Sequence, residues 1–214
     1  MDILETHHRP LGKRERNRIN NRKAILEAAR TCFREKGFEN TTIRDIVRQT
    51  RLAAGTFYNY FASKEDIFVA LLTDFLNHQN DALSQLRRSA DTTEEFIEST
   101  YLALFRSTAR DPLVYELAHR NDQAIKKLFG SGIMGLTMLS LEDDVRSAID
   151  RGLLPSVDVD YLCAAFFGVA LELSVKVAHR ANVDPQAGEL ESRRAAKFAS
   201  RLFLGGLEHM TELS

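Results

Sequence analysis

Residues 41–64 read TTIRDIVRQTRLAAGTFYNYFASK, and this stretch decides the fold. Thr42, followed three residues later by Asp45, is a variant capping box, so we expect a short helix that starts here and ends near Thr50. A second short helix is expected over residues 54–61, after a connection of about three residues. Two short helices at this spacing are typical of a helix-turn-helix, whose second helix lies in the major groove of DNA.

The exposed face of the second helix carries the small and hydrogen-bonding groups that reading base edges requires. These residues are Gly55, Thr56, Tyr58, Asn59 and Tyr60. Phe57 and Phe61 are expected to point inward as core anchors. Because Thr56, Asn59 and Tyr60 are of a size that can meet bases, the pattern favours sequence-specific binding of double-stranded DNA over non-specific binding.

Charge is distributed unevenly along the chain, although the 214 residues carry a net charge of only −1. Residues 9–64 hold 14 Lys/Arg against 5 Asp/Glu, a net of +9, and the other residues have a net of −10. The N-terminal part is therefore suited to meet an anion. We expect a flexible basic arm over residues 1–19, a helix-turn-helix domain over residues 20–64, and a second domain over residues 65–214.

Helical spacing of apolar residues begins at Asn20, and Gly37 is a plausible end of this first helix. A long helix is expected from Ser63 to about Ser89. Further helix starts are indicated by cap residues at Thr92, Asp111-Pro112, Asp158 and Asp184-Pro185. About nine helices and no convincing strand predict an all-α protein.

Three quoted segments carry a family resemblance: AARTCFREKGF at residues 28–38, TTIRDI at 41–46 and GTFYNYFASKE at 55–65. Together they resemble the DNA-binding domain of TetR-family transcriptional regulators over about residues 20–68. The resemblance implies an all-α homodimer with a small-molecule pocket in its C-terminal domain, and usually repression that the ligand relieves. It also assigns roles to single residues. Phosphate contacts would fall to Thr42, Tyr58 and Lys64, and Gly55, Thr56, Asn59 and Tyr60 would lie nearest the bases.

The connection between the two short helices departs from the family pattern. Arg51 stands where glycine is usual, and a positive φ would strain it. Ala53 stands where Ser or Thr often caps the second helix. Arg51 is expected to compensate through a phosphate contact, and Arg44 lies on the helix that braces across the DNA backbone.

The C-terminal part is rich in aromatic residues that could line a cavity between helices, although plain core packing is the alternative for each of them. The candidates for a ligand site are Phe75, Tyr101, Phe105, Tyr115, Met134, Met138 and Phe166, with His78, His119 and Glu172 to orient a polar head group. For the polar candidates, a surface position or a paired core position is the alternative. Such a cavity favours a small, largely apolar effector.

The last two helices are expected to form a two-fold dimer. Residues 162–177 are apolar almost all round, so one side can face the core and the other a second copy. Residues 195–207 add small side chains and Gly205-Gly206 for close approach. A two-fold dimer predicts a palindromic operator.

Enzyme, cofactor and membrane signals are weak. GSGIMG at residues 130–135 fits G-x-G-x-x-G, but a dinucleotide site needs a preceding strand, and helix is expected there. Six histidines and two cysteines show no metal-ligand spacing. The longest apolar run, residues 162–171, is shorter than the about 20 residues of a membrane span. We therefore expect no cofactor, no membrane and a cytoplasmic location.

The predicted function is a ligand-responsive DNA-binding regulator that is not an enzyme. A repressor released from its operator by the effector is the first interpretation. The alternatives are an activator or a co-repressor-dependent regulator of the same fold. A different class, a helical enzyme or carrier with a basic N-terminal module, would need a catalytic set in residues 90–214, and the sequence shows none.

Overall fold

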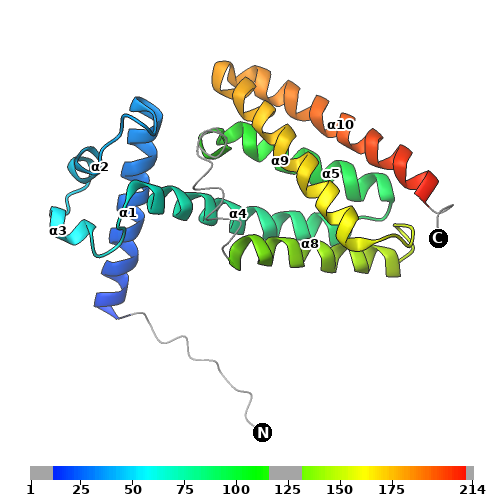
Figure 1. The fold of residues 1–214 in the computed structure, drawn as a ribbon, viewed down its shortest axis with the longest axis horizontal. Helices are drawn as coiled ribbons and strands as arrows, with labels where there is room; N and C mark the ends of the chain where they lie inside the picture. Colours follow the sequence, from blue (N-terminus) through cyan, green and yellow to red (C-terminus); the bar gives the residue numbers. More distant parts are fainter. Residues whose placement is uncertain (1–11, 116–131, 211–214) are drawn as a thin grey trace, which may run out of the picture. The chain divides into compact units, whose positions relative to one another are not determined.

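The computed structural model describes residues 12–115 and 132–210, and every regular element in these ranges is an α-helix (Figure 1). This confirms the predicted all-α class. The helices are α1 (Lys13–Lys36), α2 (Ile43–Gln49), α3 (Ala54–Phe57), α4 (Lys64–Ser89), α5 (Thr93–Arg110), α8 (Gly132–Asp150), α9 (Val159–Val183) and α10 (Pro185–Met210).

The chain divides into two compact units, Met1–Ile67 and Phe68–Ser214. The predicted boundary after residue 64 lies three residues before this division. Helix α4 therefore starts in the first unit, and all but its first turn belongs to the second.

Helix α1 starts earlier than the sequence pattern predicts. We expected a flexible arm through residue 19, but α1 begins at Lys13, and residues 1–11 lie outside the described ranges. The first two turns are almost entirely exposed, so no apolar spacing marks them. Long-chain residues with high helix propensity and the 2.8 Å ion pair between Arg18 and Glu15 hold these turns instead.

The first unit is built on a small aromatic core. Ile25 and Phe33 of α1, Ile46 of α2 and Phe57 of α3 are each at most 2% exposed. Helix α1 ends at Gly37, as predicted, where φ is +76° and the amide donates to Phe33 O at 3.0 Å. The predicted inward position of Phe57 and Phe61 is confirmed.

The second unit is a helical bundle in which α5, α9 and α10 pack against one another and α8 packs against α9. Aromatic rings fill its centre. Tyr101 stacks on Phe105 and on Phe203, and the ring centroids of Phe166 and Phe203 are 4.3 Å apart. The predicted caps form, because the side chains of Thr92 and Asp158 accept hydrogen bonds from the first turns of α5 and α9.

Helix α9 is long and apolar enough to cross a membrane by length and composition alone. The continuous apolar run, residues 162–171, is shorter than the apolar part of α9, because Glu172 interrupts it. One face of α9, which includes Leu162, Cys163 and Phe166, is buried in the core of the second unit. A single helix of this kind is weak evidence for a span, because core helices of helical bundles pass the same test of length and composition.

Gly188 lies at a close approach between α9 and α10. A Cβ added there would lie 2.7 Å from Ala181 Cβ, 3.1 Å from Ala181 Cα and 3.3 Å from Ala109 Cβ. Gly188→Ala is therefore expected to destabilise the protein by about 1–3 kcal/mol through overpacking. Thermal or urea unfolding measures this. The control is Gly168→Ala in α9, where the new methyl group meets no atom within 4 Å and stability should hold or rise. Equal stability of Gly188→Ala and wild type would contradict the packing.

Candidate nucleic-acid interface and apolar cavity

A complete capping box fixes the start of α2. Thr42 Oγ1 accepts a hydrogen bond from the Asp45 amide at 3.2 Å, and the Asp45 carboxylate accepts one from the Thr42 amide at 3.0 Å. Lys36 Nζ binds the same carboxylate at 2.7 Å. The hydrogen bonds from Lys36 and Thr42 hold the pKa of Asp45 well below its ordinary value. Thr42 is exposed at the N-terminus of α2, where its phosphate contact stays a prediction.

Helix α3 is shorter than predicted. It spans Ala54–Phe57, and the chain continues to Tyr60 as a turn, with hydrogen bonds from Asn59 N to Thr56 O and from Tyr60 N to Phe57 O. Ala53 contributes no side-chain cap to this helix. Gly55 loses more backbone entropy on folding than other residues do, which disfavours the helix. Local interactions therefore do not extend the helix beyond its first turn. Buried Phe57 anchors it to the core of the first unit.

Arg51 fits the connection without strain. Within the described ranges, no residue other than glycine has a positive φ. The connection therefore accommodates an arginine where the family pattern has glycine, and the side chain of Arg51 is exposed.

The residues predicted to read bases differ in exposure. Gly55 and Asn59 are exposed, Tyr58 is 60% exposed, and Thr56 and Tyr60 are half-buried. Asn21 Nδ2 donates to Tyr60 Oη at 3.2 Å, which ties the turn after α3 to α1. Sequence reasoning missed Asn21, since a contact across 39 residues leaves no local pattern.

Lys64 has a structural role that the sequence did not reveal. Its Nζ donates to Phe38 O at 2.8 Å and to Glu39 O at 3.1 Å, and it lies 4.6 Å from the centroid of the Phe38 ring. Lys64 thus fastens the start of α4 to the loop after α1. An ammonium has three donor protons, so one is left for the predicted phosphate contact.

A row of exposed arginines accompanies the helix-turn-helix. Arg44 and Arg48 are four residues apart on α2 and therefore share one face, and Arg51 follows in the connection. None of the three forms an ion pair with a described residue. Sequence reasoning missed Arg48, although its spacing from Arg44 could have revealed it. Basic side chains placed in this way suit contacts with DNA phosphates.

The second unit contains an apolar cavity with a volume of about 130 Å³. Helices α4, α5, α8 and α9 supply nearly all of its wall. The lining residues are Leu72, Leu76, Gln79, Asn80, Leu83 and Arg87, then Phe96, Ile97, Thr100, Tyr101, Leu104 and Tyr115, and finally Thr137, Leu141, Phe166, Phe167, Ala170 and Leu171. Its lining, which is mostly apolar with a few polar side chains, has the chemistry of a ligand pocket.

Three of the predicted ligand residues, Tyr101, Tyr115 and Phe166, line this cavity. The hydroxyl group of Tyr101 donates to Phe166 O at 3.0 Å. Burial raises the pKa of both tyrosines above the ordinary value. Hydrogen bonds from Ser174 and Thr108 lower the pKa of Tyr115 and so oppose the effect of burial. Both tyrosines are therefore neutral wall residues.

The other predicted ligand residues are not part of the described cavity wall. Phe75 packs edge-on against Tyr115 at 5.5 Å, and Phe105 is fully buried beneath Tyr101. Met138 packs against the core, and His78 and Glu172 are exposed. Helical spacing identifies the apolar face of a helix but not which of its rows borders a cavity. His119 and the side chain of Met134 lie outside what the structure describes.

Sequence reasoning missed the polar residues that α4 places on the cavity wall. Gln79, Asn80 and Arg87 lie among leucines that line the same cavity. A polar residue on the apolar face of a long helix is the signal that could have found them. Gln79 is buried, and its amide contacts Ser107 of α5.

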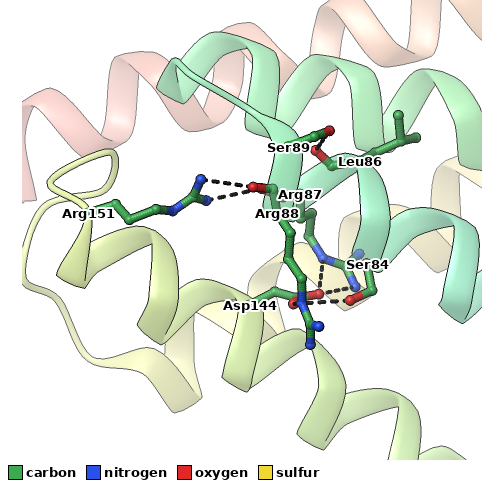
Figure 2. A network of polar contacts seen from close by, with 7 residues as sticks. All are labelled: Ser84, Leu86, Arg87, Arg88, Ser89, Asp144 and Arg151. Carbon is green, nitrogen blue, oxygen red and sulfur yellow. Dashed lines mark hydrogen bonds and ion pairs between the residues drawn. The ribbon is translucent and has the colours of Figure 1, made fainter.

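Figure 2 shows the side chains of Ser84, Arg87 and Arg88 converging on the Asp144 carboxylate. Arg87 binds Asp144 through Nε and Nη2, both at 2.9 Å, and Arg88 Nε binds it at 2.8 Å. The Arg87 and Asp144 side chains are only 5% and 1% exposed. Burial lowers the pKa of Arg87, and Asp144 opposes this shift.

Arg151 at the end of α8 also holds the end of α4. Its guanidinium donates to the carbonyls of Arg87, Arg88 and Ala90 at 3.0–3.1 Å. These carbonyls belong to the last turn of α4 and the residue after it, where backbone acceptors lack helical partners. Asp144 and Arg151 therefore fasten α8 to the C-terminal end of α4.

Residues 25–71 match the family model of bacterial regulatory proteins of the tetR family. The chain is 36% identical over 88 residues to YfiR of Bacillus subtilis, an uncharacterized HTH-type transcriptional regulator, covering 41% of this chain and 42% of YfiR. It is 32% identical over 98 residues to AcnR, an HTH-type transcriptional repressor of Corynebacterium efficiens, covering 46% and 45%. The matches thus span less than half of these relatives.

Solved structures extend the likeness to nearly the whole chain. The fatty acid degradation regulator FadR of Bacillus halodurans superposes with a TM-score of 0.71 at 20% identity, covering 94% of this chain and all of that one. FadR of Bacillus subtilis, solved in complex with stearoyl-CoA, gives a TM-score of 0.67 at 20% identity and covers 83% and 97%. At this identity the likeness shows the fold.

Proposed function

Because its N-terminal unit is a DNA-binding domain of the tetR family, we propose that this chain is a ligand-responsive transcriptional regulator. The observation that carries the proposal is the course of α4, which starts beside the helix-turn-helix and then lines the apolar cavity. One chain thus holds a surface for an operator and a site for a small, largely apolar effector. The stearoyl-CoA bound by Bacillus subtilis FadR supports a ligand with a large apolar part.

We propose repression as the mode of action, supported by the repressor AcnR among the relatives. An effector that binds better to the DNA-free form shifts the population away from the operator-bound form. An activator or a co-repressor-dependent regulator would use the same two sites. The sign of the coupling between effector and DNA separates these alternatives.

We also propose that α9 and α10 pair with the same helices of a second copy. Tyr161 of α9 and Phe198 and Leu202 of α10 are large apolar residues with exposures of 79%, 60% and 51%. Tyr161 and Leu202 border an apolar groove between these two helices. Exposed apolar patches of this kind mark interaction sites, and a second copy offers a matching surface. The dimer would read a palindromic operator.

Selection of duplexes from a random-sequence pool tests the proposed function on the full chain. We expect a preferred duplex, bound with an affinity that falls steeply with salt. Asn59→Ala should change the preference between duplexes, by about 1–3 kcal/mol at the affected base pair. The absence of any preferred duplex would overturn the proposal.

Lys64→Ala tests backbone contact and should weaken binding to all duplexes and flatten the salt slope by about one unit. Because Lys64 also binds two carbonyls, its thermal unfolding must be compared with that of the wild type. Arg48→Ala is the matched control, since it removes an exposed charge near the same surface and breaks no described hydrogen bond. If both variants keep the salt slope of the wild type, neither side chain contacts a DNA phosphate, and the DNA must bind another part of the surface.

A further inference from the structure

The cavity of the second unit is long and has apolar walls. Along α4 its lining runs from Leu72 to Arg87, which is about 22 Å at the 1.5 Å rise per residue of an α-helix. Leucine side chains form most of this row, and phenylalanines and leucines of α5 and α9 supply most of the facing wall. An extended hydrocarbon chain is the ligand shape that such walls accommodate.

One end of this row carries a charge. Among the described lining residues, Arg87 is the only charged side chain, and it is 5% exposed. Its Nε and Nη2 bind Asp144, whereas Nη1 makes no hydrogen bond with a described residue. A guanidinium nitrogen in this position can donate to a ligand group that reaches the end of the cavity.

The carboxylate that binds Arg87 also serves other partners. Asp144 is shared with Arg88 and with the Ser84 hydroxyl, so one buried carboxylate faces two guanidinium groups. Arg151 brings a third guanidinium to the carbonyls of the same turn. Arg88, Arg151 and Asp143 are all exposed, so solvent screens their charges. Asp144 is thus not available to Arg87 alone, and Nη1 of Arg87 remains a donor for an anionic group at this end of the row.

We propose that the cavity binds a long-chain carboxylate, with the hydrocarbon chain along α4 and the carboxylate hydrogen-bonded to Arg87. This inference rests on the proposed function and names the chemical class of its effector. Asp144 holds the guanidinium in place through two nitrogens, and the ligand uses the third.

Competition against a fluorescent apolar dye, with the full chain and no DNA, tests the inference. The probes are hexadecanoate, hexadecanol and the hexadecanoyl thioester of N-acetylcysteamine, which share one chain length and differ in the head group. We expect hexadecanoate to bind at least about tenfold more tightly than either uncharged probe, because its hydrogen bond to Arg87 is charge-assisted. Equal binding of the thioester and the acid would overturn the proposal, since a carbonyl acceptor would then suffice.

Variants assign the preference to Arg87. Arg87→Met should bring the three probes to similar affinity, and Asp144→Asn should widen the gap in favour of hexadecanoate, because Arg87 then lacks its counter-ion. Arg88→Met is the control: it removes a guanidinium from the same carboxylate, but Arg88 does not line the cavity. Its preference for hexadecanoate should remain. Arg87→Gln, which removes the charge but keeps polar donors, replaces Arg87→Met if the latter does not fold.

An unchanged preference in the folded Arg87 variant would overturn the assignment, as would loss of the preference in Arg88→Met alone. These outcomes are independent of the proposed function. If the random-sequence selection yields no preferred duplex, regulation fails while the dye measurements still report on the cavity. If the probes bind without discrimination, only the ligand class fails.

Discussion

Operator DNA is expected to weaken effector binding by the same factor by which the effector weakens DNA binding, and this factor should approach 10⁴. Moving the chain from about 99% DNA-competent to about 99% released requires a preference of roughly 10⁴, or ~5.5 kcal/mol, for the released form. One effector per subunit would share this difference in a dimer. The equality of the two factors is a thermodynamic requirement.

Helix α4 provides the covalent route for this coupling. Ser63 caps its first turn with a 3.1 Å hydrogen bond from the Asp66 amide, and Lys64 ties that turn to the loop before α2. Farther along the same helix, residues 72–87 line the cavity. A ligand that displaces this part of α4 would therefore act on the helix that starts in the first unit, which contains the helix-turn-helix.

Titration of the effector with and without operator measures the coupling. Equal affinities in the two titrations would rule out release by the effector, even if it binds tightly. Tighter binding in the presence of operator would identify a co-repressor. Ala170→Trp supplies the control, because a large side chain on the cavity wall should abolish effector binding and leave operator binding intact.

Breaking the proposed dimer is expected to reduce operator affinity by at least about 10²–10³. The double variant Phe198→Glu/Leu202→Glu places two carboxylates on the exposed apolar face of α10. A dimer binds the second half-site at a high effective concentration, and a monomer loses this gain. Phe198 is 60% exposed and Leu202 is 51% exposed, so the charges should leave the fold of one subunit intact.

Light scattering at micromolar concentration and operator titration test this expectation together. The matched variant Phe198→Leu/Leu202→Met keeps the surface apolar and should remain dimeric with near-normal affinity. A monomeric wild type, or a double glutamate variant that stays dimeric, would refute the pairing through α10.

Features that depend on neighbouring residues could be predicted from the sequence. Thr42, Thr92 and Asp158 cap helices because each side chain meets an amide within its own first turn. Gly37 ends α1 because only glycine adopts a positive φ without strain. The helix-turn-helix, the most informative part of the site, is specified by such local signals over residues 41–64. Two local features were nevertheless misjudged: the exposed start of α1 and the early end of α3.

Features that depend on how helices pack could not be predicted. Asn21 meets Tyr60 across 39 residues, and Arg87 meets Asp144 across 57. Tyr101 and Phe105 are four residues apart and therefore share one face of α5. Only the packing of the other helices decides that Tyr101 lines the cavity while Phe105 is buried in the core. The sequence by itself thus determined most of the helices and the helix-turn-helix, because their signals act within one or two turns. The tertiary structure decided which side chains share the cavity and which charges share Asp144, because these pairings arise only when separate helices come together.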